Sequence, residues 1–267
     1  MEDGFYGELI GDPTAAEHYF EPQTQNLDCE EMAVADVVGQ ETGHQPSEAE
    51  ITTLAEHTPS TVNVNPTTGQ PEPVYVPSTG TALQDAPELL AHYHVSGQYF
   101  DNTTATVSGA PGSGLEVLQQ DLAAGDKVIA SVDGPYIWNA IGDGPANDPG
   151  HADHVVVVTG IDTTKGVVYL NDSGVPNGGD EAVPISVFQH AWDTSGDAMV
   201  VAQPTVHDEI TTVPAGPTQA TPTPAASGGY GLAGGAGLAA AAGATAAYWA
   251  NQRRNKNRKG HAPQAAA

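Results

Sequence analysis

Apolar and polar residues follow a helical period in the first half of the chain. Residues 29–39 (CEEMAVADVVG) place small and apolar side chains among acids, which predicts a helix with one buried face. Ser47 and Glu50 form a capping box, which predicts the start of a second helix. A third helix is expected from residues 85–88, with proline in its first turn, and a fourth over residues 114–124, ended by a glycine.

The second half of the chain has the patterns of strands. Residues 128–132 are short and β-branched, and residues 154–160 form a continuous apolar run, which is typical of a strand buried on both faces. Residues 167–171 follow after a short turn, so we expect these last two segments to pair as a hairpin. A short helix at residues 185–192 and a strand at 198–202 complete the set. Helices followed by an antiparallel sheet indicate an α+β fold.

The composition changes after the domain that we predict for residues 1–204. Residues 205–228 are rich in Thr, Pro and Ala, which predicts a semi-extended linker. Residues 229–250 are uncharged and end in Tyr-Trp before a basic tail, residues 251–267, so they form a candidate transmembrane helix. Their Ala and Gly content contributes little to membrane insertion, and a low-complexity tail is the alternative.

The formal net charge is -26, and the charged residues are distributed unevenly along the chain. All 33 Asp and Glu residues lie at or before Glu209, where only Lys127 and Lys165 oppose them. Such an acidic body repels phosphate backbones, so we predict no nucleic-acid binding. A highly solvated surface explains the charge, and recruitment of cationic peptides is the alternative. The N-terminus has neither a basic region nor an apolar run, so no ordinary signal peptide is visible.

The single cysteine, Cys29, is the candidate nucleophile. It begins the first predicted helix, where partial positive charge and unsatisfied N–H groups lower a thiol's pKa and can bind an oxyanion. Glu30 and Glu31 work against that effect. Gln23, six residues before the cysteine, can donate its side-chain amide to an oxyanion, and Gln25 competes for this role.

A histidine and an aspartate in the predicted hairpin are the candidate general base and the residue that orients it. His154 opens the most apolar strand directly after a Gly/Pro/Asp loop, which suits a general base. Asp172 ends the next strand, so the hairpin brings its carboxylate to the imidazole and fixes the tautomer. Asn171 is the alternative orienting residue, although it should face the other side of the sheet. A metal site built from His151, Asp153 and His154 is a weaker alternative, and we predict no metal or cofactor.

The order Gln23, Cys29, His154, Asp172, with the segments HVVVVTGID and VYLNDSG, resembles the double-glycine or bacteriocin-processing cysteine peptidases (cysteine peptidase family 39) of the papain-like clan. The resemblance covers roughly residues 15–205. It implies a papain-like fold with N-terminal helices packed on the antiparallel sheet. It also implies a Cys-His-Asp triad, Gln23 in the oxyanion hole, and peptide or protein substrates cleaved after Gly-Gly.

Two departures from that pattern keep further interpretations open. Glu30 and Glu31 stand where the family has small residues, and Ser173 stands where many members have proline. A catalytically silent papain-like domain that binds peptides or partners is therefore the main alternative, and a cell-wall hydrolase of the NlpC type ranks last. We expect a bacterial protein of the cell envelope, or a secreted one, with self-release by cleavage at Gly228-Gly229 as a further hypothesis.

Overall fold

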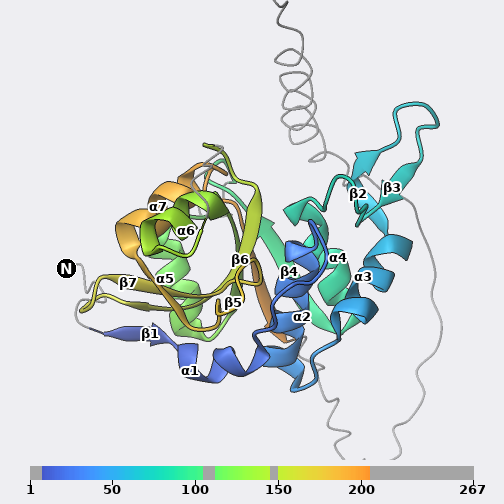
Figure 1. Cartoon of the computed structure of the whole chain (residues 1–267). Coiled ribbons are helices and arrows are strands. Elements are labelled where there is room, and N and C mark those ends of the chain that lie inside the picture. Colours follow the sequence, from blue (N-terminus) through green and yellow to red (C-terminus); the bar gives the residue numbers. More distant parts are fainter. Residues whose placement is uncertain (1–7, 105–111, 145–149, 205–267) are drawn as a thin grey trace, which may run out of the picture. The chain divides into compact units, whose positions relative to one another are not determined.

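The computed structural model describes residues 8–104, 112–144 and 150–204 (Figure 1). Within these ranges an antiparallel sheet has the strand order β4-β9-β5-β6-β7-β8, with β1 paired to β6, and a separate hairpin joins β2 and β3. The elements in chain order are β1 (Leu9–Gly11), α1 (Pro13–Ala16), the 3-10 helix η1 (Glu17–Tyr19), α2 (Cys29–Thr42), α3 (Glu48–His57), β2 (Pro59–Val64), β3 (Pro71–Pro73), the 3-10 helix η2 (Leu83–Asp85), α4 (Ala86–His92), β4 (Val95–Phe100), α5 (Leu115–Ala124), β5 (Lys127–Val132), α6 (Gly134–Ile141), β6 (His154–Asp162), β7 (Val167–Asn171), β8 (Glu181–Pro184), α7 (Ile185–Asp193) and β9 (Met199–Pro204).

The predicted helices are confirmed, and their ends follow the expected chemistry. Ser47 caps α3 with its hydroxyl oxygen, which accepts from the Glu50 N–H, while the Glu50 carboxylate accepts from the Ser47 N–H. Gly125 ends α5 in the left-handed conformation, at φ 92°. Gly43 ends α2 in the same way, a turn beyond the predicted segment.

The sheet is covered by helices on both faces, as the prediction of a strand buried on both faces at residues 154–160 requires. Helices α2 and α4 pack on one face, with α3 against these two helices, and α5, α6 and α7 lie on the other side (Figure 1). The reason is visible in β6, where all nine residues are buried. Val155 and Val157 join the first core and Val156 and Val158 join the second, so this strand requires an apolar layer on each side.

The expected hairpin forms between β6 and β7. Val157 lies opposite Asn171, and Asp162 lies opposite Val167, with a register shift between Val158 and Gly160. The pairing brings the residue that follows β7 near the start of β6, as the sequence predicted. The α+β fold is thus confirmed for the described residues.

The linker, the candidate transmembrane helix and the basic tail, residues 205–267, lie outside the described residues. The described helices include none that is long and apolar enough to cross a membrane. The domain boundaries, the membrane insertion of residues 229–250 and the cell-envelope location stay predictions.

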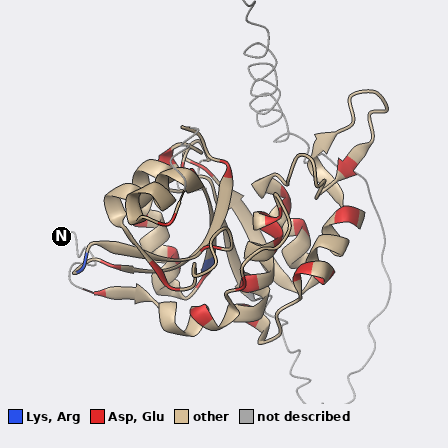
Figure 2. Ribbon diagram, in the orientation of Figure 1, with Lys and Arg blue, Asp and Glu red and all other residues tan. Residues whose placement is uncertain are grey.

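The described part of the chain is rich in acidic residues on the face that Figure 2 presents. Asp and Glu lie on helices of both layers, with few cationic residues between them. Lys127 lies 3.5 Å from a carboxylate oxygen of Glu41, and Lys165 lies 3.1 Å from one of Asp162, so the two lysines are both paired with acids.

Candidate active site

The structure joins His154 to Asp172 directly. The Nε2 atom of His154, the first residue of β6, lies 2.6 Å from Oδ1 of Asp172. Both side chains are buried, at 6% and 0% exposure. A hydrogen bond of this length between an imidazole and a carboxylate fixes the ring and its tautomer, with the proton on Nε2 and with Nδ1 left for another partner.

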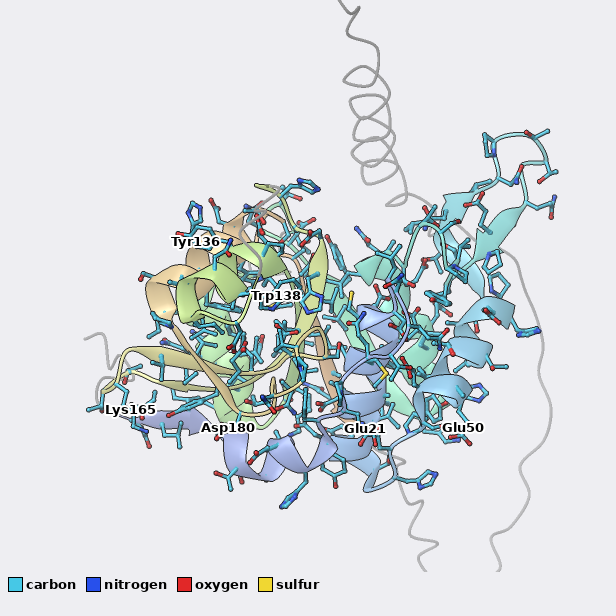
Figure 3. All side chains as sticks on the ribbon, in the orientation of Figure 1. Glu21, Glu50, Tyr136, Trp138, Lys165 and Asp180 are labelled. Atoms are coloured by element: carbon cyan, nitrogen blue, oxygen red, sulfur yellow. The ribbon has the colours of Figure 1, made fainter. Side chains whose placement is uncertain are left out.

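Two further donors hold the Asp172 carboxylate. The indole N–H of Trp138, on α6, donates to Oδ2 at 2.7 Å, and the backbone N–H of Gly174 donates to Oδ1 at 2.8 Å. Trp138 lies on the face of α6 turned toward β6 (Figure 3). Burial raises the pKa of Asp172, but His154, Trp138 and Gly174 outweigh it, and the pKa is held below its usual value. The carboxylate therefore stays ionised in a buried place.

Glycines pack against the His154 ring from two sides. A Cβ atom on Gly174 would lie 2.9 Å from Cε1 of His154 and 2.8 Å from the Trp138 ring. A Cβ atom on Gly134, the first residue of α6, would lie 2.8 Å from the His154 Cβ. Trp138 completes the enclosure with an edge-on contact at 5.1 Å between ring centroids. Gly134, Gly174 and Trp138 therefore pack closely around the ring.

Cys29 approaches the histidine from the opposite layer of helices. It begins α2 and is half-buried, and its sulfur lies close enough to the His154 ring to raise the pKa of that ring. Burial lowers the pKa of His154, but the Asp172 carboxylate and the Cys29 sulfur raise it well above the ordinary value. A protonated imidazole beside a thiol is the arrangement that stabilises a thiolate.

The acidic side chains that follow Cys29 in the sequence are buried. Glu30 and Glu31 are at most 1% exposed, and neither carboxylate oxygen of Glu30 has a hydrogen-bond partner among the described residues. Burial is the main cause that raises the pKa of Glu31 to about 7 and that of Glu30 well above its ordinary value. Burial thus favours the protonated form of both glutamates, which reduces the negative charge beside the sulfur.

Of the two candidate glutamines, Gln23 is the one tied to the site. Its backbone N–H donates to the Ser173 carbonyl at 2.9 Å, and its Oε1 accepts from the Ser173 hydroxyl at 3.1 Å. Gln25 instead contacts α3 through Glu48 and Thr52. Gln23 therefore lies beside the residue that follows Asp172, and its side-chain amide uses one of its two N–H donors on the Gln25 carbonyl, at 3.1 Å.

Asn171 and Asp153 each make contacts of their own. Asn171 faces the opposite side of the sheet, as expected, and donates to Asp36 at 2.7 Å and to the Ala16 carbonyl at 2.9 Å. Asp153 accepts from the Gly134 N–H at 3.3 Å. Of the residues in the alternative metal site, His154 thus contacts Asp172, and Asp153 contacts the Gly134 backbone.

Sequence reasoning missed several residues around the site. Trp138 and Gly134 lie on α6, which was not predicted, although Asp133 and the proline after Gly134 are a visible helix start: the Asp133 carboxylate accepts from the Tyr136 N–H. Nothing in the sequence signals that an indole 34 residues away meets Asp172. That contact depends on how α6 packs on the sheet.

The site thus places half-buried Cys29 of the helical layer beside the buried pair of His154 and Asp172 at the antiparallel sheet. The sequence matches the Peptidase_C39 like family over residues 17–200, and the chain belongs to that family. Uncharacterized proteins of Mycobacterium tuberculosis and Mycobacterium bovis are each 42% identical to it over 203 residues, which are 74% of this chain and 86% of theirs.

Two solved structures are similar to the chain over most of its length. One, described as a C39-like peptidase from Bacillus anthracis, is 17% identical, with a TM-score of 0.49, and the match covers 73% of this chain and 98% of that one. The other is a double glycine motif protease from an AMS/PCAT transporter in complex with the leader peptide. It is 11% identical, with a TM-score of 0.39, and the match covers 76% and 96% of the two chains.

Proposed function

We propose that the protein is a cysteine peptidase that hydrolyses peptide bonds through Cys29, His154 and Asp172. The observation that carries the proposal is the buried contact of 2.6 Å between the His154 ring and the Asp172 carboxylate, with the Cys29 sulfur beside that ring. Membership of a peptidase family supports it. The alternative is a domain that binds peptides without cleaving them.

Each group has a defined task in this reaction. The Cys29 thiolate attacks the carbonyl carbon of the substrate while His154 holds the proton on Nδ1. The oxyanion that forms is stabilised by the Gln23 amide and by the first-turn N–H groups of α2, because the Asp28 side chain does not cap that turn. His154 then gives its proton to the leaving amine, and water hydrolyses the thioester.

The substrate class follows from the same reasoning. A peptide backbone supplies both the carbonyl that the thiolate attacks and the amine that leaves. Because the chain resembles double-glycine peptidases, peptides that contain a Gly-Gly pair are the first substrates to test.

Alkylation of the full chain with iodoacetamide tests the proposal. We expect His154→Ala to slow alkylation of Cys29 at pH 6 by about tenfold or more, because the imidazolium that stabilises the thiolate is gone. His18→Ala, which removes an exposed histidine, is the matched control and should leave the rate unchanged. In parallel, the wild type should cleave Gly-Gly peptides, and Cys29→Ser should not. Equal alkylation of wild type and His154→Ala, together with no cleavage, would leave the binding domain as the function.

A further inference from the structure

The loop between η1 and α2 carries the Gln23 amide and is held in a strained shape. Gln23 is anchored on Ser173 by two hydrogen bonds, and the Tyr75 hydroxyl donates to the Asn26 carbonyl at 3.0 Å. Leu27 has φ 66°, in the left-handed region that a residue with a Cβ adopts only when its surroundings impose it. The shape of this loop therefore depends on its anchors.

Glu48 supplies the most extensive anchor. Its Oε1 accepts from the Thr24 N–H at 2.6 Å and from the Gln25 N–H at 3.0 Å, while its Oε2 accepts from the Thr24 hydroxyl at 2.5 Å. Glu48 is also the first residue of α3, where the positive end of the helix dipole favours a negative charge. Three donors on one carboxylate identify Glu48 as the ionised group.

Asp28 faces this carboxylate from the other end of the loop. It is fully buried, and apart from its own backbone N–H no donor among the described residues reaches its oxygens. Its carboxyl lies close to that of Glu48, whose negative charge raises the pKa of Asp28. Two carboxyl groups this close are most stable when one of them holds a proton, and the buried group without donors is the one that holds it.

We propose that Glu48 is the positioning residue of the loop that carries Gln23, and that a proton on Asp28 keeps Glu48 in place. This inference rests on the proposed function, since positioning matters through the oxyanion contact of Gln23. Ionisation of Asp28 sets two negative carboxylates against each other, the Glu48 contacts to Thr24 and Gln25 loosen, and Gln23 loses its alignment.

The electrostatics of the surrounding groups agree with this geometry. Burial, followed by the neighbouring Glu48 carboxylate, raises the pKa of Asp28 to about 7. Partial burial disfavours the charge on Glu48, but the donors on Thr24 and Gln25 lower its pKa overall. The other groups that face Asp28 are Glu31 of α2 and Tyr75, which follows β3. Both are acids, so neither stabilises an ionised Asp28.

Amide hydrogen exchange in the full chain tests the loop independently of activity. In wild type, the protection factors of the Thr24 and Gln25 amides should fall about tenfold between pH 6 and pH 8, as expected when one hydrogen bond is lost. In Asp28→Asn the side-chain amide donates to Glu48 at any pH, so protection should stay constant. Constant protection in wild type, or the same fall in Asp28→Asn, would overturn the inference.

Steady-state kinetics separates this inference from the proposed function. Glu48→Gln should lower kcat about tenfold or more with KM nearly unchanged, because an oxyanion donor acts in the transition state. Glu56→Gln, an exposed position on the same helix, is the matched control. The Asp28→Asn variant should remain active at a higher pH than the wild type does. An unchanged pH profile in an active Asp28→Asn enzyme contradicts the positioning role, whereas the predicted exchange behaviour without any peptide cleavage contradicts only the proposed function.

Discussion

The Asp172 carboxylate is the most fully satisfied polar group of the candidate site. It receives hydrogen bonds from the His154 ring, the Trp138 indole and the Gly174 backbone, all between 2.6 and 2.8 Å. A buried charge is tolerated when it is paired and hydrogen-bonded in this way. The same contacts make the site sensitive to any change that alters the acceptor.

Replacement of Asp172 by Asn should disable the site. The new amide nitrogen would face one of the three donors, and it could not favour an imidazolium, so we expect kcat/KM to fall by about 10²- to 10⁴-fold. Cleavage of a Gly-Gly peptide measures this. Asp180→Asn makes the same charge change at a position whose φ of 52° asparagine also adopts, and it should retain activity. Near-normal activity of Asp172→Asn would show that His154 needs no ionised partner.

Gly174→Ala tests the packing around the histidine. The added methyl group would lie 2.9 Å from the His154 ring and 2.8 Å from Trp138, so the ring must turn and the alkylation rate of Cys29 should fall toward that of His154→Ala. Gly43→Ala is a useful contrast, because it adds strain at φ 73° in open space, away from the site. Gly43→Ala should cost stability by about 1 kcal/mol and leave the thiol unchanged.

At this scale the sequence identified residues whose chemistry is visible in their type and spacing. His154 and Asp172 were found because both lie at the ends of strands that a hairpin must pair. Trp138, Gly134 and Glu48 were missed because they reach the site through the packing of α6 and α3. Tertiary contacts of this kind leave no local signal in a single sequence.

Helix α3 has a clear sequence signal for its start, and its first residue contacts a loop that is distant in the sequence. Its capping box fixes where the helix begins, and so it fixes where the carboxylate of Glu48 projects, toward the loop before α2. The elements that were predicted correctly each have a signal of this kind, which is a helix cap, a glycine at the helix end or an unbroken apolar run. Strands β1, β4 and β8 and helix α6 were missed because they are short and their patterns are broken by glycine, proline or polar residues.

Ser47→Ala should destabilise the domain without removing a residue of the site. Loss of the capping hydroxyl leaves the Glu50 N–H without its side-chain acceptor, and we expect the free energy of unfolding to fall by about 1 kcal/mol. Urea unfolding followed by circular dichroism measures the change. Thr53→Ala, exposed on the same helix, should show no such loss. Equal stability of both variants would mean that α3 is held by packing alone.

Over the whole molecule, buried acids link stability to pH. Burial is the main cause that raises the pKa of Asp28, Glu31 and Asp36 to about 7 each, from ordinary values of 3.8 to 4.5. At pH values between the ordinary pKa of these groups and about 7, the folded protein binds more protons than the unfolded chain. Stability that is fully present near pH 4 is therefore lost as the pH rises toward 7, by up to about 1.4 kcal/mol per pH unit for each group.

We therefore predict that the free energy of unfolding is larger at pH 5 than at pH 8. Urea titrations at intervals of one pH unit measure it. Asp36→Asn should flatten the dependence, because the amide keeps a buried neutral group between Gln40 and Asn171. A stability that rises over this interval would mean that the buried carboxyls are ionised in the folded protein.

The last strand of the sheet, β9, lies between the edge strand β4 and β5. The ribosome therefore finishes the domain by adding the strand that joins β4 to the rest of the sheet. Until that strand emerges, β4 has no pairing strand in the described sheet and β5 lies at its edge. A chain cut short before residue 199 would therefore present open backbone N–H and C=O groups on both strands, which can pair with another chain and promote aggregation.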